Sequence, residues 1–209
     1  MQEIEYILPA EIEKRSFEII GRELKQQGIV LAPENEPVIK RAIHTTADFD
    51  YAHTLTFSEH AVALAQQLLK DGADIVTDTN MALAGINKKK LQACGGMVHC
   101  FMADEDVAAL AKERSITRAS VSMEKAAKLK KPVIFAIGNA PTALLSLYDM
   151  IETGAFRPAF IIGVPVGFVN VEAAKERILS TDVPCIVNRG RKGGSNVAAA
   201  ICNALLYTI

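Results

Sequence analysis

The chain has 209 residues, a length that favours one domain spanning residues 1–209. Half of its residues are hydrophobic and 22% are charged, a balance typical of a globular enzyme rather than a disordered chain. The formal net charge of −1 gives no general attraction to nucleic acid or to an anionic membrane, so any anion binding must come from a local cluster.

The N-terminal segment "MQEIEYILPAEIEKRSFEII" is acidic and lacks the basic and then apolar layout of a signal peptide. No apolar stretch approaches the roughly 20 residues that a helix needs to span a bilayer. Four cysteines spread through the chain do not suggest a disulfide framework. We therefore expect a cytoplasmic protein with no membrane partner.

Helical patterns come first, at about residues 9–27, 34–44 and 58–70, and Ser58 is placed to cap the third. Short apolar runs then alternate with further helical patterns. The predicted strands are 73–79, 96–102, 132–137, 159–164 and 183–187, and the later helices are 104–130, 140–153, 171–180 and 195–207. This alternation predicts an α/β fold, a doubly wound and largely parallel sheet flanked by helices in a single domain.

Ligands of such sheets bind beyond the carboxyl ends of the strands, where this chain carries turn-forming and hydrogen-bonding residues. The first of these segments contains Thr77, Asp78 and Thr79. Later segments are "GNAPTALL", "PVGFVN" and "NRGRKGGSN". We expect these strand ends to form the ligand site.

The segment "GNAPTALL" follows the strand predicted at 132–137. Gly138 permits a tight turn, Asn139 or Ala140 can cap the next helix, and Pro141 suits its first turn. Thr142 and the nearby backbone N–H groups would then face a ligand, and exposed amides at a helix start attract anions. An ordinary strand-to-helix turn explains the same residues, so both interpretations stay open.

The segment "NRGRKGGSN" is basic and rich in glycine. Its cations are Arg189, Arg191 and Lys192. Its glycines, which let the backbone approach a ligand closely, are Gly190, Gly193 and Gly194. Ser195 is placed to cap the final helix. Guanidinium groups bind carboxylates or phosphates through paired hydrogen bonds, so we predict an anion-binding loop. The phosphate-binding motifs G-x-x-x-x-G-K-[ST] and G-x-G-x-x-G are absent, which disfavours ATP and NAD.

The segment "RAIHTTADFDYAH" supplies the best titratable candidate, His44, which lies one helical turn after Arg41. An imidazole titrates near pH 6.5, and a nearby guanidinium makes it a stronger acid. A structural role for His44 is the alternative, while His53 is interpreted as an exposed bystander. We expect no metal, because "CGGMVHC" lacks the ligand spacing of zinc modules. The residues alone indicate an α/β enzyme or binding protein for a polyanionic organic ligand.

Seven segments together resemble the precorrin-8X methylmutase family, which includes cobalt-precorrin-8 methylmutases. They occur in order over nearly the whole chain: "EKRSFEII", "RAIHTTADFD", "TDTNMALAGI", "ITRAS", "AIGNAPTAL", "GVPVGFVN" and "GRKGGSNVAAAICNALL". The resemblance implies an isomerase of corrin biosynthesis that moves a methyl group from C-11 to C-12 of a polycarboxylate tetrapyrrole. It also implies a homodimer with no separate organic cofactor. "HTTAD" inclines the expectation toward the cobalt-containing substrate.

The resemblance also implies roles for individual residues. It implies that His44 protonates a ring nitrogen, with Thr45 and Thr46 shaping its surroundings, and that Ser16 contacts the ligand. Further candidates for binding the substrate carboxylates are Arg15, Arg41 and Arg118, with the backbone amides of residues 138–142 and 193–195. The chain departs from the family pattern where an E-S-K run is usual, because it reads Ala173-Ala174-Lys175. A non-catalytic corrinoid carrier and a phosphate-ligand enzyme are the competing functions.

Overall fold

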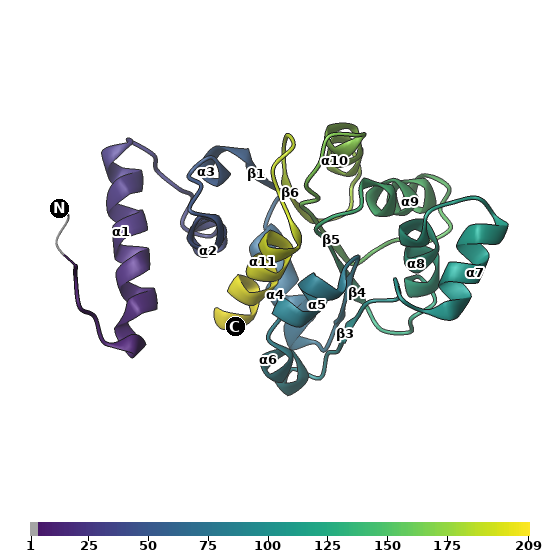
Figure 1. Ribbon diagram of the computed structural model, residues 1–209, viewed down its shortest axis with the longest axis horizontal. Coiled ribbons are helices and arrows are strands. Elements are labelled where there is room, and N and C mark those ends of the chain that lie inside the picture. The colour runs from purple at the N-terminus through teal and green to yellow at the C-terminus, as the bar shows by residue number, and fades with distance from the viewer. Residues whose placement is uncertain (1–3) are drawn as a thin grey trace.

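Residues 4–209 are described by a computed structural model, in which helices surround one six-stranded sheet (Figure 1). The strand order is β1-β6-β5-β4-β2-β3. The strands are β1 (Leu55–Phe57), β2 (Asp74–Thr77), β3 (Val98–His99), β4 (Val133–Ile137), β5 (Phe160–Gly163) and β6 (Cys185–Asn188). All neighbouring strands are parallel except β1 and β6. The predicted doubly wound, largely parallel sheet is confirmed.

The first half of the chain contributes a short 3-10 turn and six helices. They are η1 (Pro9–Glu11), α1 (Ile12–Gln26), α2 (Glu36–Thr46), α3 (Tyr51–Thr54), α4 (Ala61–Lys70), α5 (Asn80–Gly85) and α6 (Lys88–Ala93). The second half contributes α7 (Glu105–Glu113), α8 (Arg118–Ala126), α9 (Pro141–Glu152), α10 (Val171–Leu179) and α11 (Ser195–Tyr207). No helix within residues 4–209 is both long enough and apolar enough to cross a membrane.

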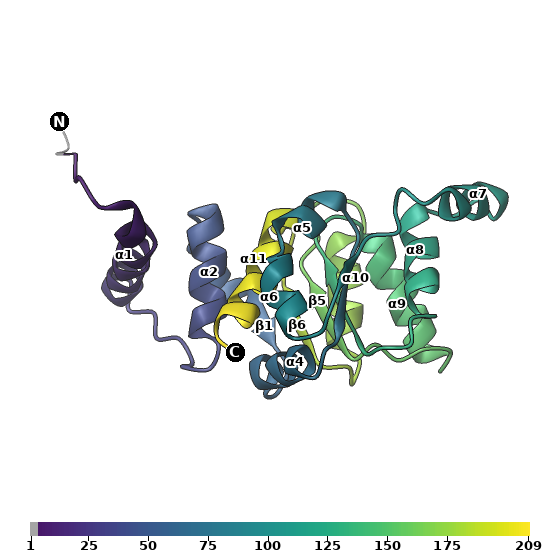
Figure 2. The same cartoon turned by 90° about the horizontal axis from the view of Figure 1, so that it is seen from below.

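The central strands are buried on both faces, as their continuous apolar runs predict. Every residue of β2, β4, β5 and β6 is buried. One hydrophobic core lies between the sheet and the layer of α2, α4, α5, α6 and α11, and the other lies beneath α8, α9 and α10. Figure 2 shows the two helical layers on opposite sides of the sheet. α1 lies outside the first layer and packs on α2.

Three details of the prediction are wrong. The strand predicted at 96–102 shrinks to two residues of an edge strand, and the helix predicted at 104–130 is divided into α7 and α8. The division follows from Ser115, whose φ of 53° ends α7, and from Thr117, whose Oγ1 accepts the N–H of Ser120 to begin α8. Ser58 does not cap α4. Its Oγ accepts the N–H of Cys185, which extends the pairing of β1 with β6.

Candidate functional site

Four parallel strands, β2, β4, β5 and β6, end at one edge of the sheet, and the segments that follow them meet there. β1 runs the other way, so the residues that precede it reach the same edge. The register places Leu55 opposite Asn188, and the N–H of Arg189 donates to the carbonyl of Thr54 at 2.9 Å. The His44 segment and the basic loop, residues 189–194, are therefore neighbours although they lie far apart in the sequence.

Asp78 organises the turn after β4. Its buried carboxylate accepts the backbone N–H groups of Gly138 (2.8 Å), Asn139 (2.8 Å) and Ala140 (2.6 Å). Burial raises the pKa of this carboxyl, against the lowering effect of its backbone donors. Ala140 caps α9 and Pro141 occupies its first turn, as expected. The expectation that these three amides receive substrate carboxylates is not met, because the internal carboxylate already occupies them.

Threonine hydroxyls join the end of β2 to the start of α11. Thr79 Oγ1 caps α5 by accepting the N–H of Ala82 at 3.1 Å, and it donates to Ser195 Oγ at 2.8 Å. Thr77 Oγ1 donates to the carbonyls of Thr79 and His99. The prediction that Ser195 caps α11 is wrong, because Gly194 occupies that position and the serine hydroxyl is engaged with Thr79.

The three loop cations lie at the predicted edge, and each is paired with an acidic side chain. Lys192 Nζ contacts Asp48 (2.6 Å) and Asp50 (2.5 Å), which raise its pKa above the usual lysine range. Arg191 pairs with Glu172 at 2.7 Å, and Arg189 pairs with Glu176 at 3.3 Å; these are α10 carboxylates. All three cations are exposed. Exposed ion pairs contribute little stability, so the cations are available to exchange these partners for an anionic ligand.

His44 is exposed on α2, one turn after Arg41, as the spacing predicts. Its ring centroid lies 5.3 Å from that of Phe17 on α1. Arg41 lies over the same Phe17 ring at 4.7 Å and pairs with Glu13 at 2.6 Å. The imidazole is thus supported on one side by an aromatic ring and accessible to a ligand.

Thr46 connects His44 to the basic loop. Its Oγ1 donates to the carbonyl of Ala42 at 2.8 Å and accepts the N–H of Asp48 at 3.3 Å. Asp48 in turn holds Lys192. Thr45 is exposed beside His44. One short segment therefore carries the proposed acid and the carboxylates that neutralise the loop.

Other predicted site residues lie farther along this edge or on α1. Arg118 begins α8 and has no acidic partner within residues 4–209, while its neighbour Thr117 donates to Thr142 Oγ1 at 3.0 Å. On α1, Arg15 pairs with Glu5 and Glu18, and Ser16 Oγ donates to the carbonyl of Ile12. No contact joins Arg15 or Ser16 to the basic loop in the described part of the chain.

Three further residues lie at this edge that the sequence did not predict as site residues. Asn188 is buried, accepts the Thr54 hydroxyl at 2.7 Å and donates to the carbonyl of Lys192 at 2.8 Å. Lys175 is also buried, and its signal was a lysine on the apolar face formed by Val171, Ala174 and Ile178. Phe168 is 83% exposed beside the loop, with the Arg191 guanidinium 5.6 Å from its ring centroid.

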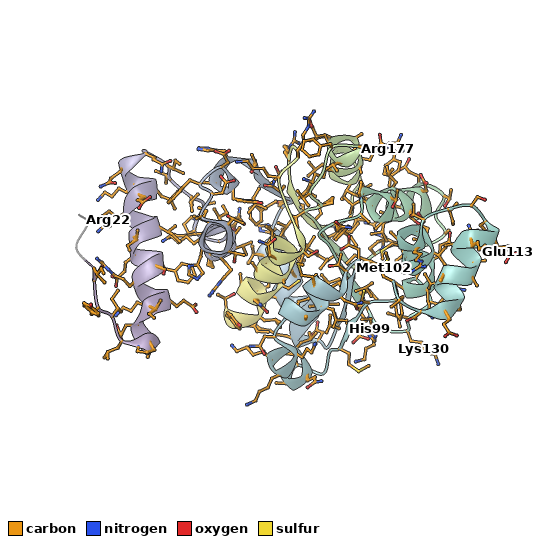
Figure 3. All side chains as sticks on the ribbon, in the orientation of Figure 1. Arg22, His99, Met102, Glu113, Lys130 and Arg177 are labelled. Carbon is orange, nitrogen blue, oxygen red and sulfur yellow. The ribbon has the colours of Figure 1, made fainter. Side chains whose placement is uncertain are left out.

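The imidazole of His99 takes no part in this site. Its Nε2 pairs with Asp74, the first residue of β2, at 2.9 Å. Figure 3 shows His99 well apart from Arg177, which lies on α10 beside the loop's carboxylate partners. No group of three His, Cys, Asp or Glu side chains suited to a metal ion occurs within residues 4–209.

Residues 11–208 match the family described as CbiC, precorrin-8X methylmutase. The cobalt-precorrin-8 methylmutase of Priestia megaterium is 40% identical over 95% of this chain and 88% of its own length. That of Salmonella typhimurium is 43% identical over 95% of each chain. The crystal structure of the precorrin-8x methyl mutase from Thermus thermophilus superposes with a TM-score of 0.85 at 39% identity, covering 94% of this chain and 96% of the other.

The fold and site define a doubly wound α/β protein whose candidate ligand-binding loops lie at the carboxyl edge of its sheet. The chain belongs to the precorrin-8X methylmutase family. It is accordingly an isomerase of cobalamin biosynthesis that transfers a methyl group within a precorrin ring. The isomerase prediction is confirmed, and the alternative of a non-catalytic carrier gains no support.

Proposed function

We propose that this isomerase acts on the cobalt-containing ring, cobalt-precorrin-8, with His44 as the acid and the basic loop as the carboxylate-binding element. The observation that carries the proposal is the ion pairing of Lys192 with Asp48 and Asp50, because it joins the loop to the segment of the exposed His44. The proposed proton donor, His44, and the exchangeable cations of the basic loop therefore lie at the same edge of the sheet.

The reaction is the shift of a methyl group from C-11 to C-12, and it requires little covalent machinery. Because the shift is intramolecular, the protein accelerates it by holding the ring and stabilising the charge that develops. His44 donates a proton to a ring nitrogen, which makes the conjugated system more electron-poor. Arg189, Arg191 and Lys192 exchange their acidic partners for substrate carboxylates, and Arg118 offers a further guanidinium. Phe168 gives an apolar surface for the face of the macrocycle.

We also propose that the protein is a cytoplasmic homodimer in which residues 1–209 form one domain. Apolar side chains of the N-terminal segment support the dimer because they are largely exposed: Ile4, Tyr6, Leu8 and Ile12. Large exposed apolar side chains gathered in one segment are typical of protein contacts. The segment joins α1, which packs beside the helix that carries His44, so a second copy bound there lies close to the site.

The test is the absorption spectrum of precorrin-8 and of its cobalt form after incubation with purified wild type and His44→Ala. Loss of a positioned acid lowers kcat by about 10²–10⁴-fold. Binding of the substrate, measured by titration, changes little. His53→Ala is the matched control, since it removes an exposed histidine from the following helix.

Each outcome is informative. Conversion of the cobalt form by wild type and His53→Ala, but not by His44→Ala, supports the proposal. Equal conversion by His44→Ala removes the imidazole from the chemistry, and preference for the metal-free ring overturns the choice of substrate. Tight binding without conversion by wild type would restore the carrier hypothesis.

A further inference from the structure

Lys175 is the only basic side chain that is buried within residues 4–209, and its residue exposure is 0%. It lies on α10, on the same apolar face as Val171, Ala174 and Ile178. Its Nζ donates to the carbonyls of Gly190 (2.7 Å) and Lys192 (2.8 Å). No carboxylate lies within ion-pairing distance of it in the described chain. Burying an ammonium without a carboxylate partner costs free energy, which its hydrogen bonds must offset. Both of these hydrogen bonds end on the basic loop.

The basic loop has no regular secondary structure, yet four consecutive carbonyls are satisfied from inside the protein. Lys175 holds the carbonyls of Gly190 and Lys192, Asn188 Nδ2 donates to those of Arg189 and Lys192, and the N–H of Gly167 donates to that of Arg191. With the backbone anchored inward, the side chains of the three loop cations extend outward and are exposed. Lys175 supplies two of these anchors.

Resting on the proposed function, we infer that Lys175 is a positioning residue: its buried ammonium fixes the backbone of the basic loop and so aims the loop cations at the carboxylates of the substrate. Lys175 touches no substrate itself. Its removal leaves the Gly190 carbonyl without a donor and leaves the Lys192 carbonyl with Asn188 alone, and the loop then adopts other conformations in which the cations diverge. Binding of the polycarboxylate ring depends on their convergence, whereas proton transfer from His44 does not.

Of the charged groups on the elements around Lys175, Glu172 on its own helix interacts with it and also pairs with Arg191. The Lys192 side chain is paired with carboxylates, and the Cys185 thiol belongs to β6, which packs on α10. On α9, the Tyr148 ring lies under the Arg177 guanidinium. Burial lowers the pKa of Lys175 to about 8, and Glu172 opposes this shift. Burial raises the pKa of Cys185 to about 11 and ion pairing raises that of Lys192, so neither titrates near pH 8.

The lowered pKa gives opposite pH dependences for binding and for stability. As pH rises through about 8, Lys175 loses the charge that attracts the two carbonyls, and KM for the substrate increases. The unfolded chain keeps this proton up to the ordinary lysine pKa of 10.5, so it binds more protons than the native state between these values. The contribution of Lys175 to the free energy of unfolding therefore rises with pH in this window. If Lys175 had only a structural role, KM would not increase over the pH range in which its contribution to the free energy of unfolding rises.

The experiment compares wild type, Lys175→Met, Lys175→Arg and the control Lys112→Met, which removes an exposed lysine from α7. For each, kcat and KM are measured from about pH 6.5 to about pH 9.5, and the thermal midpoint is recorded at each pH. At pH 7 we expect Lys175→Met to raise KM about tenfold and to change kcat less than about threefold. Lys175→Arg, which keeps a cationic donor, restores part of the binding. Lys112→Met behaves as wild type.

Limited digestion with trypsin gives a readout that does not depend on activity. The basic loop contains three cleavage sites, so a loosened loop in folded Lys175→Met is cut faster than in wild type, by about tenfold. If wild type does not convert the substrate at all, the proposed function fails. Faster digestion of the variant would still support the anchoring role of Lys175. Unchanged KM and unchanged digestion in a folded Lys175→Met overturn the inference. Should that variant not fold, a wild-type KM that is flat across pH 8 overturns it equally.

Discussion

Asp78 and Lys175 carry opposite buried charges at the same edge of the sheet, and both bind backbone atoms rather than side chains. Asp78 gathers three N–H donors at the start of α9, and Lys175 gathers two carbonyls of the basic loop. Each charge fixes a turn that has no ladder hydrogen bonds of its own. At this scale the site is a set of backbone turns shaped by two buried ions.

Replacement of Asp78 by alanine should destabilise the protein strongly, because three backbone N–H groups lose their acceptor at once. We expect the free energy of unfolding to fall by about 3 kcal/mol for Asp78→Ala and by less for Asp78→Asn, which keeps one carbonyl oxygen. Urea denaturation at neutral pH measures both. Asp149→Ala, an exposed change on α9, the helix whose start Asp78 holds, serves as the control and should stay within about 0.5 kcal/mol. Equal effects of Asp78→Ala and Asp149→Ala would contradict this account.

Residue types predicted that the three loop cations lie at this edge, but not how they are paired. The loop cations follow a strand end, and parallel strand ends meet, so their location follows from the order of elements. Their carboxylate partners come from α10 and from the segment before β1. Lys192 and Asp48 are 144 residues apart, and no local pattern records that contact. The amides of residues 138–140 were misjudged for the same reason, since Asp78 lies about sixty positions earlier.

Elements were predicted best where burial is continuous. The apolar runs that became β4 and β5 have no polar interruption, so strand pairing was their only stable arrangement. β1 was missed because three residues, Leu55–Phe57, carry no detectable period, and its existence depends on the ladder offered by β6. Ser58 was assigned to a helix cap because a hydroxyl before an apolar stripe is a common start signal. Tertiary pairing with Cys185 overrode that local preference.

Two glycines of the basic loop provide a matched test of its backbone. A Cβ on Gly193 would lie 2.1 Å from the carbonyl oxygen of Val164, whereas one on Gly190 meets nothing within 4 Å and suffers only from a φ of 74°. We expect Gly193→Ala to lower the free energy of unfolding by about 3 kcal/mol and Gly190→Ala by about 1 kcal/mol. Chemical denaturation measures the difference. If the order is reversed, close approach to β5 does not shape the loop.

At the scale of the whole molecule, the two core layers are covered but the N-terminal segment is not. Tyr6 is 92% exposed and Leu8 is 74% exposed, in a part of the chain that packs against little of the described protein. Large apolar side chains that are exposed close together along the chain are unusual on the surface of a monomer. The proposed homodimer gives them a partner.

Charge placed on this segment should therefore weaken the dimer without unfolding the sheet. We expect the double variant Tyr6→Lys with Leu8→Lys to sediment as a monomer at concentrations where wild type is a dimer. The monomer should remain folded, with a cooperative thermal unfolding transition. Val30→Lys alters an equally exposed apolar residue in the turn after α1 and should leave the dimer intact. A wild type that sediments as a monomer, or a double variant that remains dimeric, would reject this surface as the interface.

The short reversed strand β1 has a kinetic consequence. It pairs on one side only, through three residues and the hydroxyl of Ser58, and it joins the His44 segment to the basic loop. Edge elements of this size open locally at a lower free energy than the whole protein unfolds. Each opening separates His44, the proposed acid, from the loop cations while the rest of both hydrophobic cores persists. Under the proposed function, the folded enzyme therefore alternates between a competent state and an open one. A polycarboxylate that bridges the two segments is expected to slow hydrogen exchange of the β1 amides.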